Sequence, residues 1–301
     1  MTYQIGLDGG GTKTECILVD AHGVVVARHV APGCNPSVAG VAQARLIVTD
    51  ALCALLAESK IENPKAKITA THFYTAGAPA FWRELADSLV DFGRVVTGVD
   101  SLPVLELATD GAPGLVLHAG TGSFVAARAP DGAVHYAGGI GWRFGDAASG
   151  YELGRRAIAR ALLELQGWQT PTRLGTLVRD HAQVAATAPV TEVTRFFYQH
   201  AEPNRVVAAL APAVLRLASE GDATAAALAI ESATELLALA VRVATKLFPE
   251  TALDTVRAGL SGALLIHPVV AAALTARSPL ALTPITAPPI EGVRRLLVRG
   301  G

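Results

Sequence analysis

Near its start the chain reads Asp8-Gly9-Gly10-Gly11-Thr12-Lys13-Thr14, and in its middle it reads Ala119-Gly120-Thr121-Gly122-Ser123. An apolar, strand-like segment precedes each Gly-rich stretch, and a second apolar segment, a turn with Asp and Gly, and a third apolar segment follow it. The same eleven-residue spacing links the Thr of each stretch to the Gly of the next turn, from Thr12 to Gly23 and from Thr121 to Gly132. A repeat of this length indicates two duplicated halves.

The glycines of both stretches are typical of a turn that binds phosphate, because they let consecutive backbone N–H groups converge on an anion. A P-loop is disfavoured, since Thr12 stands between Gly11 and Lys13 and a β-rich segment follows in place of a helix. A Rossmann turn is disfavoured because Thr14 occupies the place of its third Gly. A tight hairpin without a ligand is the alternative for one copy, and the second copy weighs against it. The sequence predicts a nucleotide-dependent phosphotransferase in which two hairpins grip a polyphosphate.

Composition narrows the class of protein. A chain of 301 residues is long enough for two domains, each with its own core. Lys and Arg number 25 against 26 Asp and Glu, so the chain lacks the basic surplus that nucleic acid or acidic membranes would attract. We therefore expect neither a nucleic-acid partner nor a membrane partner.

Three further observations concern location. The most apolar stretch, residues 223–248, is interrupted by four charged residues: Glu231, Glu235, Arg242 and Lys246. It therefore predicts a buried helix and no membrane span. Strand residues begin almost at Met1, which leaves no room for a signal peptide. The three cysteines (Cys16, Cys34 and Cys53) lack C-x-x-C spacing, which favours a reducing compartment without structural zinc. A cytoplasmic protein is expected.

The order of the segments predicts an α/β fold in two parts. In the first part we expect three strands up to residue 30, a helix over 38–59 capped by Ser37, and then strand 68–75, helix 81–92 and strand 94–99. The second part restarts with three strands at Gly114 and continues with helices near 148–167, 172–186, 191–200, 206–219, 222–248 and 261–275. The domains predicted are 1–107, rejoined by a terminal helix at about 286–301, and 108–285.

Together these motifs resemble the acetate and sugar kinase/Hsp70/actin superfamily. More narrowly, they resemble the group that holds N-acetylglucosamine kinase, bacterial glucosamine kinase and the BadF/BadG/BcrA/BcrD ATPases. The matching stretches cover most of the chain: 7–14 and 119–123 (phosphate motifs), 33–36 (sugar loop), 76–78, Asp100, 138–154 and, most weakly, 258–263 (adenosine motif). The resemblance implies duplicated actin-like (ribonuclease H-like) domains with a cleft between them, the second enlarged by helices.

The resemblance also implies roles for individual residues. Asp100 would be the general base of a kinase that uses ATP and Mg²⁺. The ATP phosphates would be bound by Gly10, Gly11, Thr12, Lys13, Thr14, Gly120, Thr121 and Gly122, and adenosine by Gly259 and Gly262. The sugar would be bound by Asn35, Gly77, Ser123, Asp146 and Gly150. Asp8 suits the metal, because Mg²⁺ on ATP takes only one or two carboxylates.

Structural roles compete with several of these assignments. Asp100 and Asp146 each stand where an Asp often caps a helix. Lys13 alternates with Thr12 and Thr14 along a strand and so can point away from phosphate. The residues near Gly262 also read as the start of a helix at Ser261, and His118 reads either as a phosphate neighbour or as a local hydrogen-bond partner.

The chain departs from the group at two positions on the expected sugar side. Ala147 and Ala148 follow Asp146 where the group usually has Glu and Gly, and Phe124 stands where the mammalian kinase has Asn. Both changes remove polar groups, and such changes can shift sugar preference steeply.

Three functions therefore compete. The first is a kinase of an amino sugar, N-acetylglucosamine or glucosamine, whose partner is the small-molecule sugar. The second is a BadF/BcrA-type ATPase that activates a partner enzyme, and it would need paired cysteines for a [4Fe–4S] cluster, which the spacing does not supply. The third is a sugar-responsive regulator, which would need a DNA-binding domain ahead of the first strand. A homodimer through the Ala-rich helices is compatible with their apolar surface.

Overall fold

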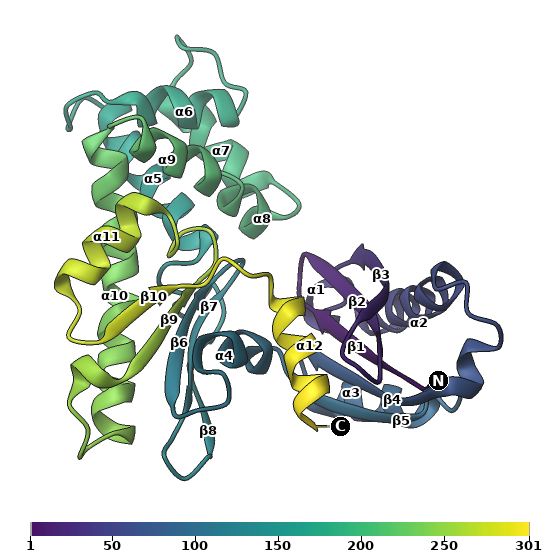
Figure 1. Cartoon of the computed structure of the whole chain (residues 1–301). Helices are drawn as coiled ribbons and strands as arrows, with labels where there is room; N and C mark the ends of the chain where they lie inside the picture. The colour runs from purple at the N-terminus through teal and green to yellow at the C-terminus, as the bar shows by residue number, and fades with distance from the viewer. Residues whose placement is uncertain (1, 301) are drawn as a thin grey trace. The chain divides into compact units, whose positions relative to one another are not determined.

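The computed structural model describes residues 2–300, with the backbone alone for Ala66 (Figure 1). The chain divides into two α/β units, each built on one five-stranded sheet. Unit 1 comprises the residues up to Gly111 and those from Ala287 on, and unit 2 comprises Ala112–Thr286. The predicted α/β class with two sheets and a helix-rich second part is confirmed.

The sheet of unit 1 has the order β3-β2-β1-β4-β5. Strands β1 (Tyr3–Gly9), β2 (Lys13–Asp20) and β3 (Val25–Pro32) form an antiparallel meander, and β4 (Ile68–Thr75) and β5 (Arg94–Val99) run parallel to β1. Because β1, β4 and β5 are parallel, the residues that follow them meet at one edge of the sheet. That edge receives the Gly-rich turn, residues 76–78 and Asp100.

Helices cover both faces of this sheet. On one face, α2 (Val41–Glu58) and α3 (Pro79–Ser88) pack their apolar side chains against β1 and β4, with Leu7, Phe73 and Trp82 in the shared core. On the other face, α12 (Pro289–Gly300) packs Val293 close to Gly6 of β1 and also contacts α4 (Ser101–Thr109). The terminal segment therefore completes the core of unit 1.

Two predicted helices of unit 1 differ in detail. The helix expected over 38–59 begins earlier and is interrupted at Gly40, which gives α1 (Pro36–Ala39) and then α2. Asn35, and not Ser37, caps α1, because the Asn35 Oδ1 accepts a hydrogen bond from the Ser37 N–H at 3.0 Å. The helix expected over 81–92 is α3, which begins with Pro79 in its first turn, a position that proline favours, and ends at Ser88. A short 3-10 helix, η1 (Pro64–Lys67), precedes β4.

The sheet of unit 2 has the order β10-β9-β6-β7-β8. Strands β6 (Gly114–Ala119), β7 (Ser123–Arg128) and β8 (Val134–Gly138) repeat the antiparallel meander, and β9 (Arg257–Ser261) and β10 (Ala281–Pro284) are parallel to β6. The helix expected at 261–275 begins only at Pro268, because Ser261 still belongs to β9 and Gly262 turns the chain. Strand β10 was not predicted, since four residues ending in proline carry no periodic signal.

The remaining helices of unit 2 enlarge it as expected. They are α5 (Gly150–Leu165), α6 (Arg173–His181), α7 (Val190–Gln199), α8 (Pro203–Ala208), α9 (Ala211–Ser219), α10 (Ala223–Leu247) and α11 (Pro268–Arg277), with the 3-10 helix η2 (Leu253–Thr255). The single helix predicted over 206–219 is two, because Pro212 cannot donate to Ala208 and its ring disfavours a continuous helix there.

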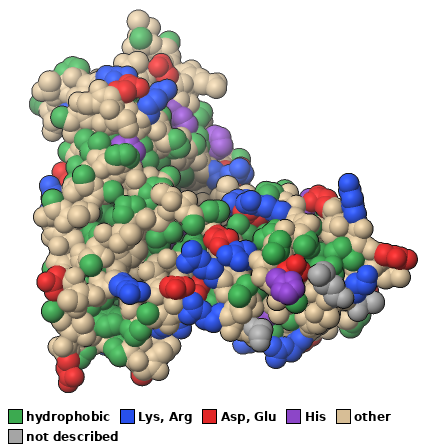
Figure 2. All heavy atoms as spheres, in the orientation of Figure 1, with side chains coloured by type: hydrophobic (Ala, Val, Ile, Leu, Met, Phe, Trp, Pro, Cys, Tyr) green, Lys and Arg blue, Asp and Glu red, His purple; other side chains and the backbone are tan. Residues whose placement is uncertain are grey.

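Helix α10 is the one candidate membrane span among the described residues by length and composition. In the structure its Ala and Leu side chains belong to the core of unit 2, and it contacts α9, α5, α11 and β7. These contacts agree with the buried helix that the sequence predicts. On the face drawn in Figure 2, side chains of both charges are interspersed, which matches the balanced composition.

Candidate functional site

In unit 1 the first Gly-rich stretch forms the turn between β1 and β2. The Gly10 N–H donates to the Lys13 carbonyl at 3.0 Å, which closes the hairpin. Gly33 packs directly against this turn: a Cβ at Gly33 would lie 2.3 Å from the Gly11 oxygen and 2.7 Å from the Thr12 nitrogen. Only glycine permits this approach, so the start of the predicted sugar loop supports the predicted phosphate turn.

The other expected sugar residues of unit 1 lie at the same turn. The Asn35 N–H donates to the Gly10 carbonyl at 3.2 Å. Gly77 has a φ of 105°, and a Cβ there would lie 3.0 Å from the Asn35 Oδ1. Because that oxygen already accepts from Ser37, the amide NH₂ is the end of Asn35 that can serve a ligand. The structure thus brings together Gly10, Gly11, Asn35 and Gly77.

Two carboxylates flank the turn. Asp8 is the second-last residue of β1, and burial raises its pKa to about 7; Lys13 lowers it, while Glu15 and Asp100 raise it. Asp100 directly follows β5, and its side chain makes no capping hydrogen bond to α4. Burial raises the pKa of Asp100 as well, against the lowering effect of the backbone N–H groups of Asp100 and Ser101. Since β1, β4 and β5 are parallel, Asp8 and Asp100 lie at the same edge of the sheet in unit 1.

The neighbours of the turn correct one expectation and add one residue. Thr14 is fully buried, and its hydroxyl donates to the Pro32 carbonyl at 2.8 Å, so its proton does not serve phosphate. Lys13 forms an ion pair with Glu15 at 2.8 Å, and Glu15 also pairs with Arg28. Glu15 is fully buried and lies opposite Asp8 across the two strands. Its only sequence signal is a carboxylate inside an otherwise apolar strand.

In unit 2 the second Gly-rich stretch forms the turn between β6 and β7. The Gly120 N–H donates to the Gly122 carbonyl at 2.8 Å, and the Gly150 N–H donates to the Gly120 carbonyl at 3.1 Å. Gly262, with a φ of 96°, packs against the end of β6, where a Cβ would lie 1.9 Å from the Ala119 oxygen. Gly120, Thr121, Gly122, Gly150 and Gly262 are therefore neighbours. Gly259 lies within β9, paired with β6 and β10, and is not part of the turn.

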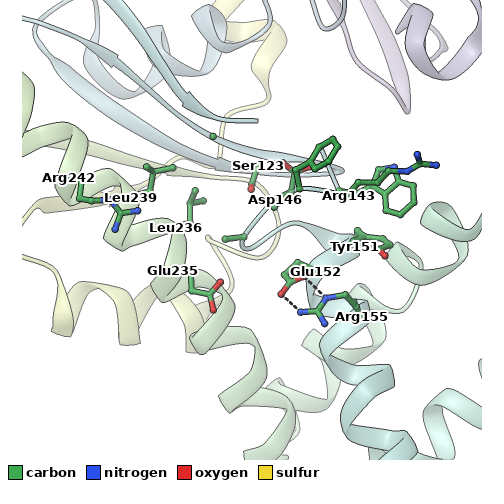
Figure 3. A pocket seen from close by; sticks show the side chains of 15 residues that line it. Ser123, Arg143, Asp146, Tyr151, Glu152, Arg155, Glu235, Leu236, Leu239 and Arg242 are labelled. Carbon is green, nitrogen blue, oxygen red and sulfur yellow. Dashed lines mark hydrogen bonds and ion pairs between the residues drawn. The ribbon is translucent and has the colours of Figure 1, made fainter. Parts of the chain in front are cut away.

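A cavity of about 600 Å³ adjoins this turn (Figure 3). Of the three expected sugar residues of unit 2, Ser123 and Asp146 line it and Gly150 does not. Asp146 is buried, and its Oδ1 has no hydrogen-bond partner within residues 2–300. Burial raises the pKa of Asp146, while the backbone N–H groups of Gly141 and Ser123 lower it. The helix that follows is capped by Ser149, whose Oγ accepts from the Glu152 N–H at 3.1 Å. A cavity-lining carboxylate with an unpartnered oxygen fits a ligand with hydroxyl groups.

The cavity also contains charged residues that the sequence analysis missed. Glu152 and Arg155 of α5 form an ion pair at 2.8 Å, visible in Figure 3, and Arg156 links Glu152 to Glu235 of α10. Arg143, Tyr151 and Arg242 complete the polar lining. The sequence could have indicated the pairs of Glu152 with Arg155 and Arg156, because their i,i+3 and i,i+4 spacing places them side by side on a helix. The link to α10 spans 79 residues of sequence and was not readable.

The two departures from the group have different surroundings. Ala147 lines the cavity, next to Asp146. Phe124 is buried and stacks between His118 and Tyr136, with ring centroids at 4.9 and 5.0 Å, and it does not line the cavity. Of the two, Ala147 is therefore the position where a lost polar group would face a ligand in this cavity.

The described residues contain no group of three or more His, Cys, Asp or Glu side chains placed to hold a metal ion by themselves. Nucleotide-bound Mg²⁺ needs less, since it keeps several waters and takes one or two carboxylates. Asp8 fits that requirement, because burial beside Glu15 and Asp100 destabilises its negative charge, and a bound cation would offset that cost.

The two meanders, each with a Gly-rich turn and parallel strands beyond it, define an actin-like α/β protein with duplicated sheets. Over residues 5–259 the chain matches the model of the BadF/BadG/BcrA/BcrD ATPase family. The chain belongs to that family.

Known relatives point to sugars. The chain is 24% identical over 241 residues to the N-acetylmuramic acid/N-acetylglucosamine kinase of Clostridium acetobutylicum, covering 78% of this chain and 77% of that protein. It is 28% identical over 170 residues to the N-acetyl-D-glucosamine kinase of Dictyostelium discoideum, covering 52% and 53%. A solved structure from Chromobacterium violaceum, provisionally named N-acetylglucosamine kinase, covers 99% of both chains with a TM-score of 0.80 and 26% identity.

Proposed function

We propose that this protein is an ATP-dependent carbohydrate kinase that transfers the γ-phosphate to a hydroxyl of an amino sugar, N-acetylglucosamine or glucosamine. Membership of the family and the names of the relatives support the reaction and the class of acceptor. The observation that carries the proposal is in unit 1. There a half-buried Asp100 without a capping bond follows β5, at the edge of the sheet that also holds Asp8 and the glycine turn.

Asp100 is the general base in this proposal. Its carboxylate accepts the proton of the sugar hydroxyl, the hydroxyl oxygen bonds to the γ-phosphorus, and the bond from that phosphorus to the bridging oxygen breaks to release ADP. Phosphoryl transfer has a loose transition state, so positioning and charge contribute more than the base alone. A pKa raised by burial still suits the role, because proton transfer works best when the base titrates nearer the working pH.

The nucleotide is assigned to the two turns. Backbone N–H groups at Gly11 and Gly122 donate to phosphate oxygens, while the N–H groups of Gly10 and Gly120 close the two hairpins. Thr12, Lys13 and Thr121 lie beside these donors. Gly259 and Gly262 remain the residues proposed for adenosine. Bound Mg²⁺ would neutralise phosphate charge, and Asp8 is the carboxylate proposed to hold it through its waters.

The sugar is assigned to polar groups with unused hydrogen-bonding capacity. The Asp146 carboxylate can accept from a sugar hydroxyl, and the Asn35 NH₂ can donate to one. Gly77 in unit 1, and Ser123 and Gly150 in unit 2, are the further residues proposed for sugar binding. Ala147 replaces a polar residue beside Asp146, and such a change can shift the preference between sugars. Both the acetylated sugar and the free amine sugar are therefore tested as acceptors.

The test is ADP release from Mg-ATP with N-acetylglucosamine, glucosamine, glucose or N-acetylmannosamine as acceptor. We expect release to depend on one amino sugar and to fall by about 10²–10⁴-fold in Asp100→Asn. The matched control is Asp110→Asn, because Asp110 ends the same helix, is largely exposed and pairs with Arg299. The control should keep its turnover within about twofold, as an exposed ion pair contributes little.

A sugar-independent ATPase that activates a partner enzyme is the alternative outcome. ATP hydrolysis that ignores every sugar and survives Asp100→Asn would overturn the kinase proposal in its favour. Cys16 and Cys34 are buried and Cys53 is exposed, so the structure offers no exposed pair for a shared cluster within the described residues. Cytoplasmic location and a homodimer through the helices of unit 2 stay predictions.

A further inference from the structure

His118 is the second-last residue of β6 and occupies the place in the second hairpin that Asp8 has in the first. Its neighbours Leu117 and Ala119 point into the core of unit 2. Since side chains alternate along a strand, the ring lies on the opposite face of the sheet, at the end that carries the Gly-rich turn.

Two contacts hold the imidazole in one orientation. Its Nδ1 is 3.1 Å from the Ser261 Oγ, at the end of β9. Its face stacks on Phe124, with the ring centroids 4.9 Å apart. Ser261 precedes Gly262, so His118 lies between the proposed phosphate turn and the segment proposed for adenosine.

The other ring nitrogen faces the phosphate turn. A Cβ built on Gly120 would lie 3.3 Å from the His118 Nε2, closer than any other atom outside that turn. Between residues 2 and 300 no group hydrogen-bonds to Nε2, and this nitrogen is not completely buried. Nε2 therefore has its hydrogen-bonding capacity available at the turn.

We propose that His118 binds a phosphate oxygen of the nucleotide at the Gly120–Gly122 turn by donating its Nε2–H. The inference rests on the proposed function and adds to it a nucleotide contact that the glycine motif does not contain. The Ser261 hydroxyl can rotate to donate to Nδ1, which leaves the proton on Nε2. A hydrogen bond from such a donor to an anionic phosphate is stronger than one between neutral groups.

The charge state of His118 fits this role. Burial lowers its pKa to about 4, so the ring is neutral at neutral pH and presents a single donor once Ser261 fixes the tautomer. Phosphate is favoured over sugar as the ligand, because His118 does not line the cavity that holds Ser123 and Asp146.

The test compares two amide variants. In His118→Asn the amide reaches only the place of Nδ1, so the contact with Ser261 persists and the donor at the turn is lost. In His118→Gln the amide reaches the place of Nε2 and can still donate to phosphate. Titration calorimetry with Mg-ATP and no sugar should show binding about 10-fold weaker in His118→Asn and within about 3-fold of the unmodified protein in His118→Gln.

Two controls isolate the phosphate contact. Adenosine has no phosphate, so its affinity, followed by ligand-observed NMR, should be the same in both variants. His135→Asn changes an exposed histidine of β8 and should leave ATP binding unaltered.

The outcomes separate the two proposals. Equal ATP affinity in His118→Asn and the unmodified protein would overturn the His118 contact. Equal weakening by both variants would also overturn it, since lost stacking on Phe124 would then explain the effect. An unmodified protein that binds no Mg-ATP would instead overturn the proposed function itself.

Discussion

The two Gly-rich hairpins have the same strand pattern, but the second-last residue of the strand before the turn is an acid in one and a base in the other. The first has Asp8, whose pKa burial raises to about 7, and the second has His118, whose pKa burial lowers to about 4. In both cases burial favours the neutral form of the side chain. The backbone of the two hairpins is duplicated, and both turns are proposed to bind phosphate. Their side chains differ: unit 1 has a carboxylate suited to a cation, and unit 2 has a neutral donor suited to phosphate.

The hairpins also share a device for closing the turn. A glycine from a distant segment packs against each one: Gly33 against the Gly11 carbonyl and Gly262 against the Ala119 carbonyl. They differ in backbone conformation, because only Gly262 has a positive φ, at 96°. Substitutions at these glycines can measure whether the two turns depend equally on close packing.

The largest effect is expected from Gly262→Ala. The new Cβ would overlap the Ala119 oxygen and also require a strained backbone, so we expect the free energy of unfolding to fall by about 4 kcal/mol. In Gly33→Ala the new Cβ overlaps Gly11 but the backbone is not strained, so the free energy of unfolding should fall by about 2 kcal/mol. Urea unfolding followed by circular dichroism measures both.

Gly132→Ala is the control for backbone strain alone. Gly132 has a φ of 86° in the turn between β7 and β8, and a Cβ there would meet nothing within 4 Å. Gly132→Ala should lower the free energy of unfolding by about 1 kcal/mol. If Gly262→Ala cost no more than this control, close packing at the second turn would not be a determinant of its structure.

The next effect concerns Asp8 and is expected to change with pH. A carboxyl with a raised pKa in the folded protein stabilises the fold at low pH, and this contribution is lost as pH rises from 3.8 towards about 7. Asp8→Asn removes that loss, so the variant should be more stable than the unmodified protein at pH 8 by about 4 kcal/mol, and no more stable below pH 4. The same variant should lose kinase activity.

Urea titrations of both proteins at pH 4, 6 and 8 test this prediction. A difference in the free energy of unfolding that stays constant with pH would show that Asp8 is ionised without cost in the fold. Asp20→Asn is the matched control, because Asp20 ends the partner strand β2 and accepts two backbone hydrogen bonds in an exposed turn.

The comparison of hairpins also shows what sequence could reveal. The meanders, the Gly-rich turns, Asp8 and Asp100 were predicted because each depends on local pattern: alternation, glycine spacing and strand-end acids. The interruption at Gly40 and the separation of α8 from α9 were missed although Gly40 and Pro212 were visible, because the apolar pattern continues across both.

Contacts between distant segments could not be predicted. Nothing local indicates that Gly33 would pack on Gly11, that Glu15 would pair with Arg28, or that Arg156 would link two helices. The direction of His118 was undecided in sequence because it depends on Ser261, which is 143 residues away. Such features come from tertiary packing, and they determine which residues of a correctly predicted motif are available to a ligand.

His118 should give the opposite pH response to Asp8, and a smaller one. A histidine with a lowered pKa in the fold contributes stability above pH 6.5 that is lost as pH falls towards about 4. From pH 8 to pH 5, the free energy of unfolding of the unmodified protein should fall by about 2 kcal/mol more than that of His118→Gln. Differential scanning calorimetry at both pH values measures this, and parallel losses in the two proteins would contradict a buried neutral imidazole.

The smallest effect is expected at Thr14, and it tests whether hydroxyls of the first hairpin serve structure or ligand. Thr14 donates to the Pro32 carbonyl, so Thr14→Val removes that part-buried hydrogen bond and should lower the free energy of unfolding by about 1 kcal/mol. Thr14→Ser keeps the hydroxyl and should recover part of the loss. Since the proton is engaged inside unit 1, the KM for ATP should change less than twofold in either variant. A KM that rises about tenfold in Thr14→Val and returns in Thr14→Ser would mean that this hydroxyl leaves Pro32 when nucleotide binds, and the first turn would then depend on side-chain donors as the second is proposed to do.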